Sequence, residues 1–275
     1  MKNLFLSVIA TALVVQASST WAATELPASI KAKGEITVAI MPNYPPMDFK
    51  DPGSNQLTGV DYDLGVAIGK ELGIKVNWQE IAFEQMVNAV VTKRVDMVMS
   101  GMTDTKERQK VVDFIDYFKT GPQFYTLTAR QDLQHDIDLC GKHVGTSRRT
   151  TFPQEIANWS KAHCEAAGKP AVVVVGTEGS ADARTQLRQR RLDAAVQGSE
   201  TLPYIMSLEK GTFKPLDKAF AFQYTGMAIG KDNTALRDAI QGALNDMIAN
   251  GTYQKILTKW GLSDNGVAKA TVNQG

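Results

Sequence analysis

The sequence predicts an α/β protein of two lobes, and three observations lead to this fold class. Segments with strand character alternate with helical segments along almost the whole chain, as in largely parallel sheets covered by helices. After removal of an N-terminal leader, about 250 residues remain, more than one hydrophobic core usually accommodates. Two stretches with strand character, residues 123–129 and 220–229, would carry the chain from one lobe to the other and back. A double crossing forms a hinge, and small ligands bind in the cleft between two such lobes.

The leader, residues 1–22, has the pattern of a secretory signal peptide. Lys2 supplies the positive start, residues 4–15 are almost continuously apolar, and Thr20-Trp21-Ala22 places small residues where a signal peptidase reads them. We expect cleavage after Ala22 and export to the periplasm. The alternative, a membrane anchor, is disfavoured because a spanning helix needs roughly 20 apolar residues.

The elements of the remaining chain follow from periodicity and from turn residues. Residues 35–41 read as the first strand, and residues 60–72 as a helix with apolar side chains every four residues and Gly73 as its C-cap. Further strands are expected at 76–79, 95–99, 143–146, 171–175 and 193–196, and further helices at 84–93, 151–167, 180–191 and 235–249. The expected organisation is lobe 1 from 23–124, lobe 2 from 125–221, a return segment from 222–264 that completes the unit, and a disordered polar tail from 265–275.

Charge and cysteine usage narrow the functional classes. The chain has 30 basic and 29 acidic residues and no long run of like charge, which disfavours nucleic acid and membrane surfaces as partners. Cys140 and Cys164 form an even count in an exported chain, so a disulfide is expected. Two buried free thiols are the alternative; a metal site is less favoured because the histidines have no compact ligand spacing.

Four segments carry a resemblance to a known family. The stretch Gly59-Val60-Asp61-Tyr62-Asp63-Leu64 is similar to the signature of the family 3 extracellular solute-binding proteins, the polar amino acid binders of ABC importers. The other segments, in the expected order and spacing, are Tyr44-Pro45-Pro46, Ser100-Gly101-Met102-Thr103 with Glu107-Arg108, and Gly251-Thr252-Tyr253 with Lys259-Trp260-Gly261. The resemblance implies a type II periplasmic binding protein fold that closes on its ligand. It further implies a monomer without cofactor or catalysis, working with an ABC importer permease.

The resemblance assigns the ligand contacts of the first lobe. In the family, the arginine at the position of Arg108 holds the carboxylate of the ligand, which a guanidinium can bind bidentately. Without the family, Arg108 reads equally well as a surface arginine. Further contacts are expected from Ser100, Gly101, Met102 and Thr103, whose alternative role is an ordinary strand-to-helix turn. Tyr44 and Phe83 occupy positions where aromatic rings enclose the ligand, with core packing as the alternative.

In the second lobe, the resemblance places a ligand loop at residues 144–151. Thr150 and Thr151 match a pair of hydroxyl residues that stands before a helix, whose N-terminal N–H groups favour an anion. Arg148 and Arg149 depart from the family, which usually has small or neutral residues there. They predict extra negative charge on the ligand, unless they are solvated loop charges.

The largest departure from the family lies at Gly198. Relatives commonly have an aspartate at this position that binds the ligand's α-ammonium group, so either Glu200 replaces it or the ligand has no ammonium group. Met41 stands where binders of basic amino acids often have an acid. The predicted ligand is therefore a neutral or acidic amino acid or analogue rather than a basic one.

Three alternatives remain on the same fold. The ligand could be an organic acid or dicarboxylate, or the protein could be a sensory module. A third reading is an enzyme similar to cyclohexadienyl dehydratase, with Glu200 as general acid.

Overall fold

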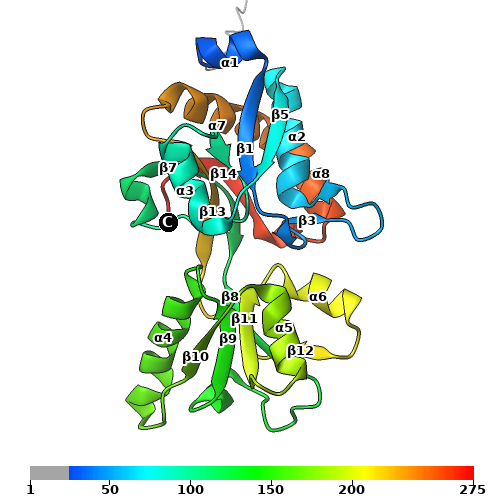
Figure 1. Cartoon of the computed structure of the whole chain (residues 1–275), viewed down its shortest axis with the longest axis vertical. Coiled ribbons are helices and arrows are strands. Elements are labelled where there is room, and N and C mark those ends of the chain that lie inside the picture. The colour runs from blue at the N-terminus through cyan, green and yellow to red at the C-terminus, as the bar shows by residue number, and fades with distance from the viewer. Residues whose placement is uncertain (1–24) are drawn as a thin grey trace, which may run out of the picture.

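A computed structural model describes residues 25–275 and shows two α/β lobes, one above the other in Figure 1. The predicted signal peptide and its cleavage point lie outside the described residues. Within residues 25–275, no helix has the length and apolar character required to cross a membrane.

The first lobe contains a six-stranded sheet with strand order β14-β7-β13-β6-β1-β5. Its strands are β1 (Glu35–Ile40), β5 (Lys75–Glu80), β6 (Met97–Val98), β7 (Val112–Thr120), β13 (Gln223–Gly230) and β14 (Gly266–Val272). Its helices are α1 (Ala28–Lys33), α2 (Val60–Leu72), α3 (Met86–Val91), α7 (Thr234–Ala249) and α8 (Thr252–Lys259). A small sheet of β2 (Asn43–Tyr44), β3 (Asp48–Lys50) and β4 (Leu57–Thr58) lies beside α2.

The second lobe contains a five-stranded sheet with strand order β10-β9-β11-β8-β12. Its strands are β8 (Pro122–Leu127), β9 (His143–Ser147), β10 (Val173–Thr177), β11 (Ala194–Gly198) and β12 (Phe213–Pro215). Its helices are α4 (Phe152–His163), α5 (Ser180–Arg188) and α6 (Leu202–Leu208). Short 3₁₀ turns complete the fold at Phe83–Gln85, Arg108–Lys110, Asp136–Leu139, Glu165–Ala167 and Ser263–Asn265.

Each lobe has its own hydrophobic core, as two-lobed architecture requires. In the first lobe, α2 buries Val60, Leu64 and Ile68 against the sheet, which is the stripe that the four-residue repeat predicts. Gly73 ends this helix with a φ of 66°, so its left-handed cap is also as predicted. In the second lobe, α4 packs Ile156 and other apolar side chains around Phe124 of β8.

The chain crosses between the lobes at two short segments that touch each other. It leaves the first sheet after β7, passes Gly121 and enters β8; it returns through residues 216–222 into β13. A Cβ atom at Gly121 would overlap the carbonyl oxygen of Ala221, so glycine is required where the segments meet. The two stretches expected to join the lobes instead pair as β8 and β13 within one sheet each. The first crossing therefore lies a few residues before the expected boundary at 124.

The C-terminal tail is ordered, and the expectation of disorder at 265–275 is wrong. Residues 266–272 form β14, which pairs antiparallel with β7 at the edge of the first sheet. Val267 and Ala270 are buried there. The final residues are also bound, because Gln274 N–H donates to Asp116 and Gly275 N–H donates to Asp104. The composition is polar and small, yet β7 provides a partner strand that is remote in sequence.

The predicted disulfide between Cys140 and Cys164 is confirmed. It links the residue after the 3₁₀ turn Asp136–Leu139 to the end of α4, inside the second lobe. Both cysteines pack in the core of that lobe.

Candidate functional site

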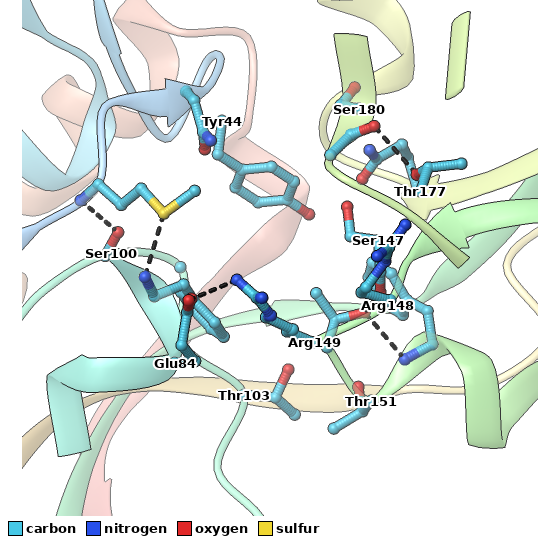
Figure 2. Close-up of a pocket in the computed structure, with 18 of the residues that line it drawn as sticks. Tyr44, Glu84, Ser100, Thr103, Ser147, Arg148, Arg149, Thr151, Thr177 and Ser180 are labelled. Carbon is cyan, nitrogen blue, oxygen red and sulfur yellow. Dashed lines mark hydrogen bonds and ion pairs between the residues drawn. The ribbon is translucent and has the colours of Figure 1, made fainter. Parts of the chain in front are cut away.

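A cavity lies between the two lobes, and its wall contains most of the residues that the sequence singles out (Figure 2). The first lobe contributes Met41, Asn43, Tyr44, Phe83, Glu84, Ser100, Gly101, Thr103 and Arg108. The second lobe contributes Ser147, Arg148, Arg149, Thr150, Thr151, Phe152, Thr177, Glu178, Gly179, Ser180 and Gln197. Loops at the ends of parallel strands supply most of these residues, as is usual for ligand sites of α/β proteins.

Arg108 is a half-buried cation on this wall. Its Nη1 donates to the carbonyl oxygen of Thr103 at 2.7 Å, and its guanidinium carbon lies 5.6 Å from the centre of the Phe83 ring. Burial lowers the pKa of the Arg108 guanidinium. Among the ion pairs of residues 25–275, none involves Arg108. Phe83 therefore serves as a platform for the arginine, and the remaining N–H donors are available to an anion in the cavity.

Ser100 and Gly101 lie on the cavity wall, but their donors are already used. The Ser100 hydroxyl donates to Asp48 Oδ2 at 3.0 Å and accepts from the N–H of Met41. The Gly101 N–H donates to Asp61 Oδ2 at 2.7 Å. The neighbouring Met102 is buried in the core beside α3 and does not reach the cavity.

Both arginines of the second-lobe loop pair with carboxylates of the protein. Arg148 Nη1 lies 2.9 Å from Glu178 Oε1 within the second lobe. Arg149 forms an ion pair with Glu84 of the first lobe, so this contact spans the cleft in Figure 2. Their charges are compensated locally, which removes the argument that they predict extra negative charge on the ligand.

Thr150 and Thr151 stand at the start of α4, as expected, and both line the cavity. The Thr150 hydroxyl donates to the carbonyl oxygen of Ser147 at 2.8 Å and accepts from the N–H of Phe152. Thr151 lies 3.5 Å from the side chain of Gln223 at the start of β13. The start of α4 thus lies against the start of β13, and both threonines line the cavity.

Gly198 and Glu200 lie behind the wall rather than on it. The Glu200 side chain is 4% exposed and accepts hydrogen bonds from the hydroxyls of Tyr44, at 2.8 Å, and of Thr120. Burial raises the pKa of Glu200 to about 7, although the Tyr44 hydrogen bond acts in the opposite direction. Tyr44 comes from the first lobe, so this contact also joins the lobes, and the tyrosine separates Glu200 from the cavity.

Several wall residues were not anticipated, and one pattern could have identified them. Glu178 and Gly179 form the loop between β10 and α5, and Ser180 is the first residue of α5. Because β10 is parallel to β9, its carboxyl end meets the same sheet edge as the 144–151 loop. Glu84 follows directly after Phe83 in the corresponding loop of the first lobe.

Comparison with known proteins gives a consistent family. The model of bacterial extracellular solute-binding proteins, family 3, matches residues 36–263. An L-arginine-binding protein of Pseudomonas aeruginosa is 30% identical over 82% of this chain and 87% of its own length. A histidine-binding periplasmic protein of Salmonella typhimurium is 28% identical over 94% of this chain and 97% of its own. The crystal structure of an ancestral amino acid-binding protein, a precursor of cyclohexadienyl dehydratase, is similar with a TM-score of 0.74 and 30% identity, covering 84% of this chain and 97% of that one.

These relatives do not support the predicted exclusion of basic ligands. Two of them are named for arginine and histidine, so a chain of this kind accommodates basic side chains in at least some members. The ion pairs Arg148–Glu178 and Arg149–Glu84 show why the sequence alone is a poor guide to the charge of the ligand. Each contributes a carboxylate as well as a guanidinium to the cavity wall.

The predicted resemblance and the two-lobed α/β fold are both confirmed. The family match covers most of the chain, and the related structure reproduces both lobes. The chain belongs to the bacterial extracellular solute-binding proteins, family 3.

Proposed function

We propose that this protein captures an amino acid in the interlobe cavity and delivers it, in the periplasm, to the permease of an ABC importer. The observation that carries the proposal is Arg108, a half-buried guanidinium on the cavity wall without an ion-pair partner among the described residues. A cation held in such a place favours a ligand carboxylate, because charge-assisted and bidentate hydrogen bonds are the strong ones.

A second uncompensated charge supports a zwitterionic ligand. Within residues 25–275, Glu200 has no cationic partner and receives only hydroxyl hydrogen bonds. Tyr44 donates its proton to Glu200, which leaves the phenol oxygen as an acceptor toward the cavity. An α-ammonium group beside Tyr44 would be stabilised by the charge of Glu200 behind it. In this way Glu200 acts in place of an acid at position 198.

The side chain of the ligand faces charges of both signs. Arg148 with Glu178, and Arg149 with Glu84, offer a donor and an acceptor each. We therefore propose a polar amino acid without excluding cationic side chains. The second candidate is an organic acid, favoured only by the missing side chain of Gly198.

Binding is favoured over catalysis by the position of Glu200. A general acid has to come within hydrogen-bonding reach of the reacting group. Glu200 has a pKa suited to that task, but Tyr44 and Thr120 occupy its oxygens and it does not line the cavity. The named relatives are binding proteins, in agreement with this proposal. We also propose that the protein works as a monomer, since each of its lobes has its own core.

Calorimetric titration of the purified protein tests the proposal. The panel is L-arginine, L-histidine, L-glutamine, L-glutamate and 2-oxoglutarate, the last being the deaminated analogue of glutamate. At least one amino acid should bind, and Arg108→Ala should reduce its affinity by about 2–3 kcal/mol. The control, Arg94→Ala, removes an exposed arginine outside the cavity and should bind normally. Binding of 2-oxoglutarate alone would favour the organic-acid candidate, and unchanged affinity in Arg108→Ala would refute the anchor.

A further inference from the structure

Two carboxyl groups are buried directly beneath the cavity. Asp48 begins β3, Asp61 lies in the first turn of α2, and both are fully inaccessible to solvent. Their backbones are held together, because the N–H of Asp61 donates to the carbonyl oxygen of Met47 at 2.8 Å. The adjacent residues Ser100 and Gly101 donate to Asp48 and Asp61 respectively, and the two carboxyl groups interact with each other.

The hydrogen bonds around the pair require one shared proton. Asp61 accepts from the Tyr117 hydroxyl and from the N–H of Gly101, so both of its oxygens have donors. Asp48 accepts from Ser100 through Oδ2 and lies close to the backbone N–H of Asn43, which donates to the carbonyl oxygen of Met41, while its buried Oδ1 has no hydrogen-bond partner among the described residues. Two ionised carboxylates in contact would repel each other in a medium of low polarity. A proton on Asp48 Oδ1, donated to Asp61, satisfies every one of these atoms.

The hydrogen bonds that Ser100 and Gly101 donate to the pair determine which groups the cavity floor presents to a ligand. The Ser100 hydroxyl donates its hydrogen bond to Asp48, and one lone pair of the Ser100 oxygen accepts from the N–H of Met41. Ser100 is left with one free lone pair and no free hydrogen. Gly101 has no free N–H, because Asp61 accepts it. The cavity floor can therefore accept a hydrogen bond through the Ser100 oxygen. It cannot donate one through the Ser100 hydroxyl or the Gly101 N–H.

We propose that Asp48 and Asp61 share a single proton, held by Asp48, and act as positioning residues that turn Ser100 toward the cavity as a hydrogen-bond acceptor. This inference rests on the proposed function and refines it. The carboxylate of the ligand is directed to Arg108, and an N–H group of the ligand is directed to Ser100. An isolated buried carboxylate pair without this role would be a costly structure to maintain.

The surroundings of the pair are consistent with one retained proton. Burial raises the pKa of Asp48 well above its usual range, and the neighbouring Asp61 raises it further. Burial also raises the pKa of Asp61, to about 6, where its donors Tyr117 and Gly101 act in the opposite direction. The other titratable groups that face the pair are Tyr44, Tyr117 and Glu200. Both tyrosines are neutral donors, since burial raises the pKa of each.

Two isosteric variants test the inference on the ligand-free protein. In Asp48→Asn, the amide N–H replaces the shared proton and the amide oxygen still accepts from Ser100. The folded wild type retains a proton that the unfolded chain loses above about pH 4, so its stability falls as pH rises. The stability of Asp48→Asn does not fall for this reason, because the amide side chain does not titrate. Its melting temperature relative to wild type should therefore increase by at least about 5 °C between pH 5 and pH 8. A difference that does not change with pH would overturn the shared proton.

Ligand titrations test the positioning role, with L-arginine and L-glutamine as probes. Arg94→Ala, at an exposed residue outside the cavity, is the control and should bind as wild type does. Asp61→Asn has only one acceptor for two donors and should bind at least about tenfold more weakly. Normal binding by Asp61→Asn would overturn the positioning. If no amino acid of the panel binds wild type, the proposed function fails, while the melting experiment still decides the shared proton.

Discussion

The carboxylate of Glu200 occupies the space in which a side chain at Gly198 would begin. A Cβ atom at position 198 would overlap Glu200 and lie 2.5 Å from the Tyr44 hydroxyl oxygen. Glycine here is therefore coupled to the Tyr44–Glu200 hydrogen bond that joins the lobes. The absence of a side chain at position 198 and the presence of an acid at position 200 are two parts of one arrangement.

Gly198→Ala should therefore weaken ligand binding through the contact between the lobes. The added methyl group displaces Glu200 or Tyr44, and we expect at least about a tenfold loss of affinity, the scale of one buried charge-assisted hydrogen bond. Titration calorimetry with the ligand identified in the panel measures it. Gly242→Ala is the matched control. Nothing lies within 4 Å of its added atom in α7, so it should bind normally and gain about 0.5–1 kcal/mol in unfolding free energy. Normal binding by Gly198→Ala would contradict the coupling.

Ligand affinity should increase with pH through the titration of Glu200. Burial raises the pKa of Glu200 to about 7, and an ammonium group nearby favours its ionised form. Binding then releases a proton, so affinity rises from pH 6 toward pH 8. In the ligand-free protein the raised pKa has the opposite effect on folding. Protonated Glu200 stabilises the folded state fully at pH values below the pKa that this group has in the unfolded chain. This contribution is lost as pH rises through about 7.

Glu200→Gln removes both pH effects in one substitution. Titrations at pH 6, 7 and 8 should give a flat affinity profile for this variant, and up to about a tenfold change per pH unit below pH 7 for wild type. Parallel profiles for the two proteins would show that Glu200 does not respond to the ligand.

The ion pair between Arg149 and Glu84 should slow the release of ligand. It connects the two lobes at the cleft, whereas the pair of Arg148 and Glu178 lies within one lobe. Because the Arg149 and Glu84 side chains are 54% and 35% exposed, solvent screening limits the effect to about 0.5–1 kcal/mol. Arg149→Gln should accelerate dissociation roughly two- to fivefold in stopped-flow measurements. Arg148→Gln is the control, and equal acceleration in both variants would argue against a role of the lobe-to-lobe contact.

Removal of the disulfide should destabilise the second lobe. Cys140 and Cys164 are 24 residues apart, and closing a loop of this length contributes about 3 kcal/mol. The double variant Cys140→Ser with Cys164→Ser should unfold at lower denaturant concentration than wild type. Titration of denatured, unreduced wild type should find no thiol in residues 25–275. Two reactive thiols in that experiment would disagree with the bond.

The fold could be predicted wherever local pattern and packing agree. The α2 stripe, its Gly73 cap and the alternation of strands and helices are visible in the sequence. Strand β7 could not be recognised because Asp113 and Asp116 interrupt its apolar pattern. In the structure Asp113 pairs with Lys231 and Arg237, and Asp116 accepts from Gln274. Burial of these acids depends on partners more than a hundred residues away.

The site was predicted through the family resemblance more than through local chemistry. It placed Arg108, Tyr44 and Thr150 on the cavity wall, where the structure also has them. The hydrogen-bonding state of Ser100 and Gly101 could not be predicted, because it depends on Asp48 and Asp61 beneath them. The compensation of Arg149 by Glu84 was equally hidden, since the two residues belong to different lobes.

The position of β14 affects the order in which the lobes can be completed as the chain emerges during synthesis. The second lobe is one continuous stretch from β8 to β12, so it can form its sheet while the C-terminal residues are still being made. The first lobe draws strands from both sides of that stretch, and β7 remains an open edge until β14 arrives. Open strand edges recruit other strands. A nascent or truncated chain without β14 would therefore expose an aggregation-prone edge at β7, beside a second lobe that has already folded.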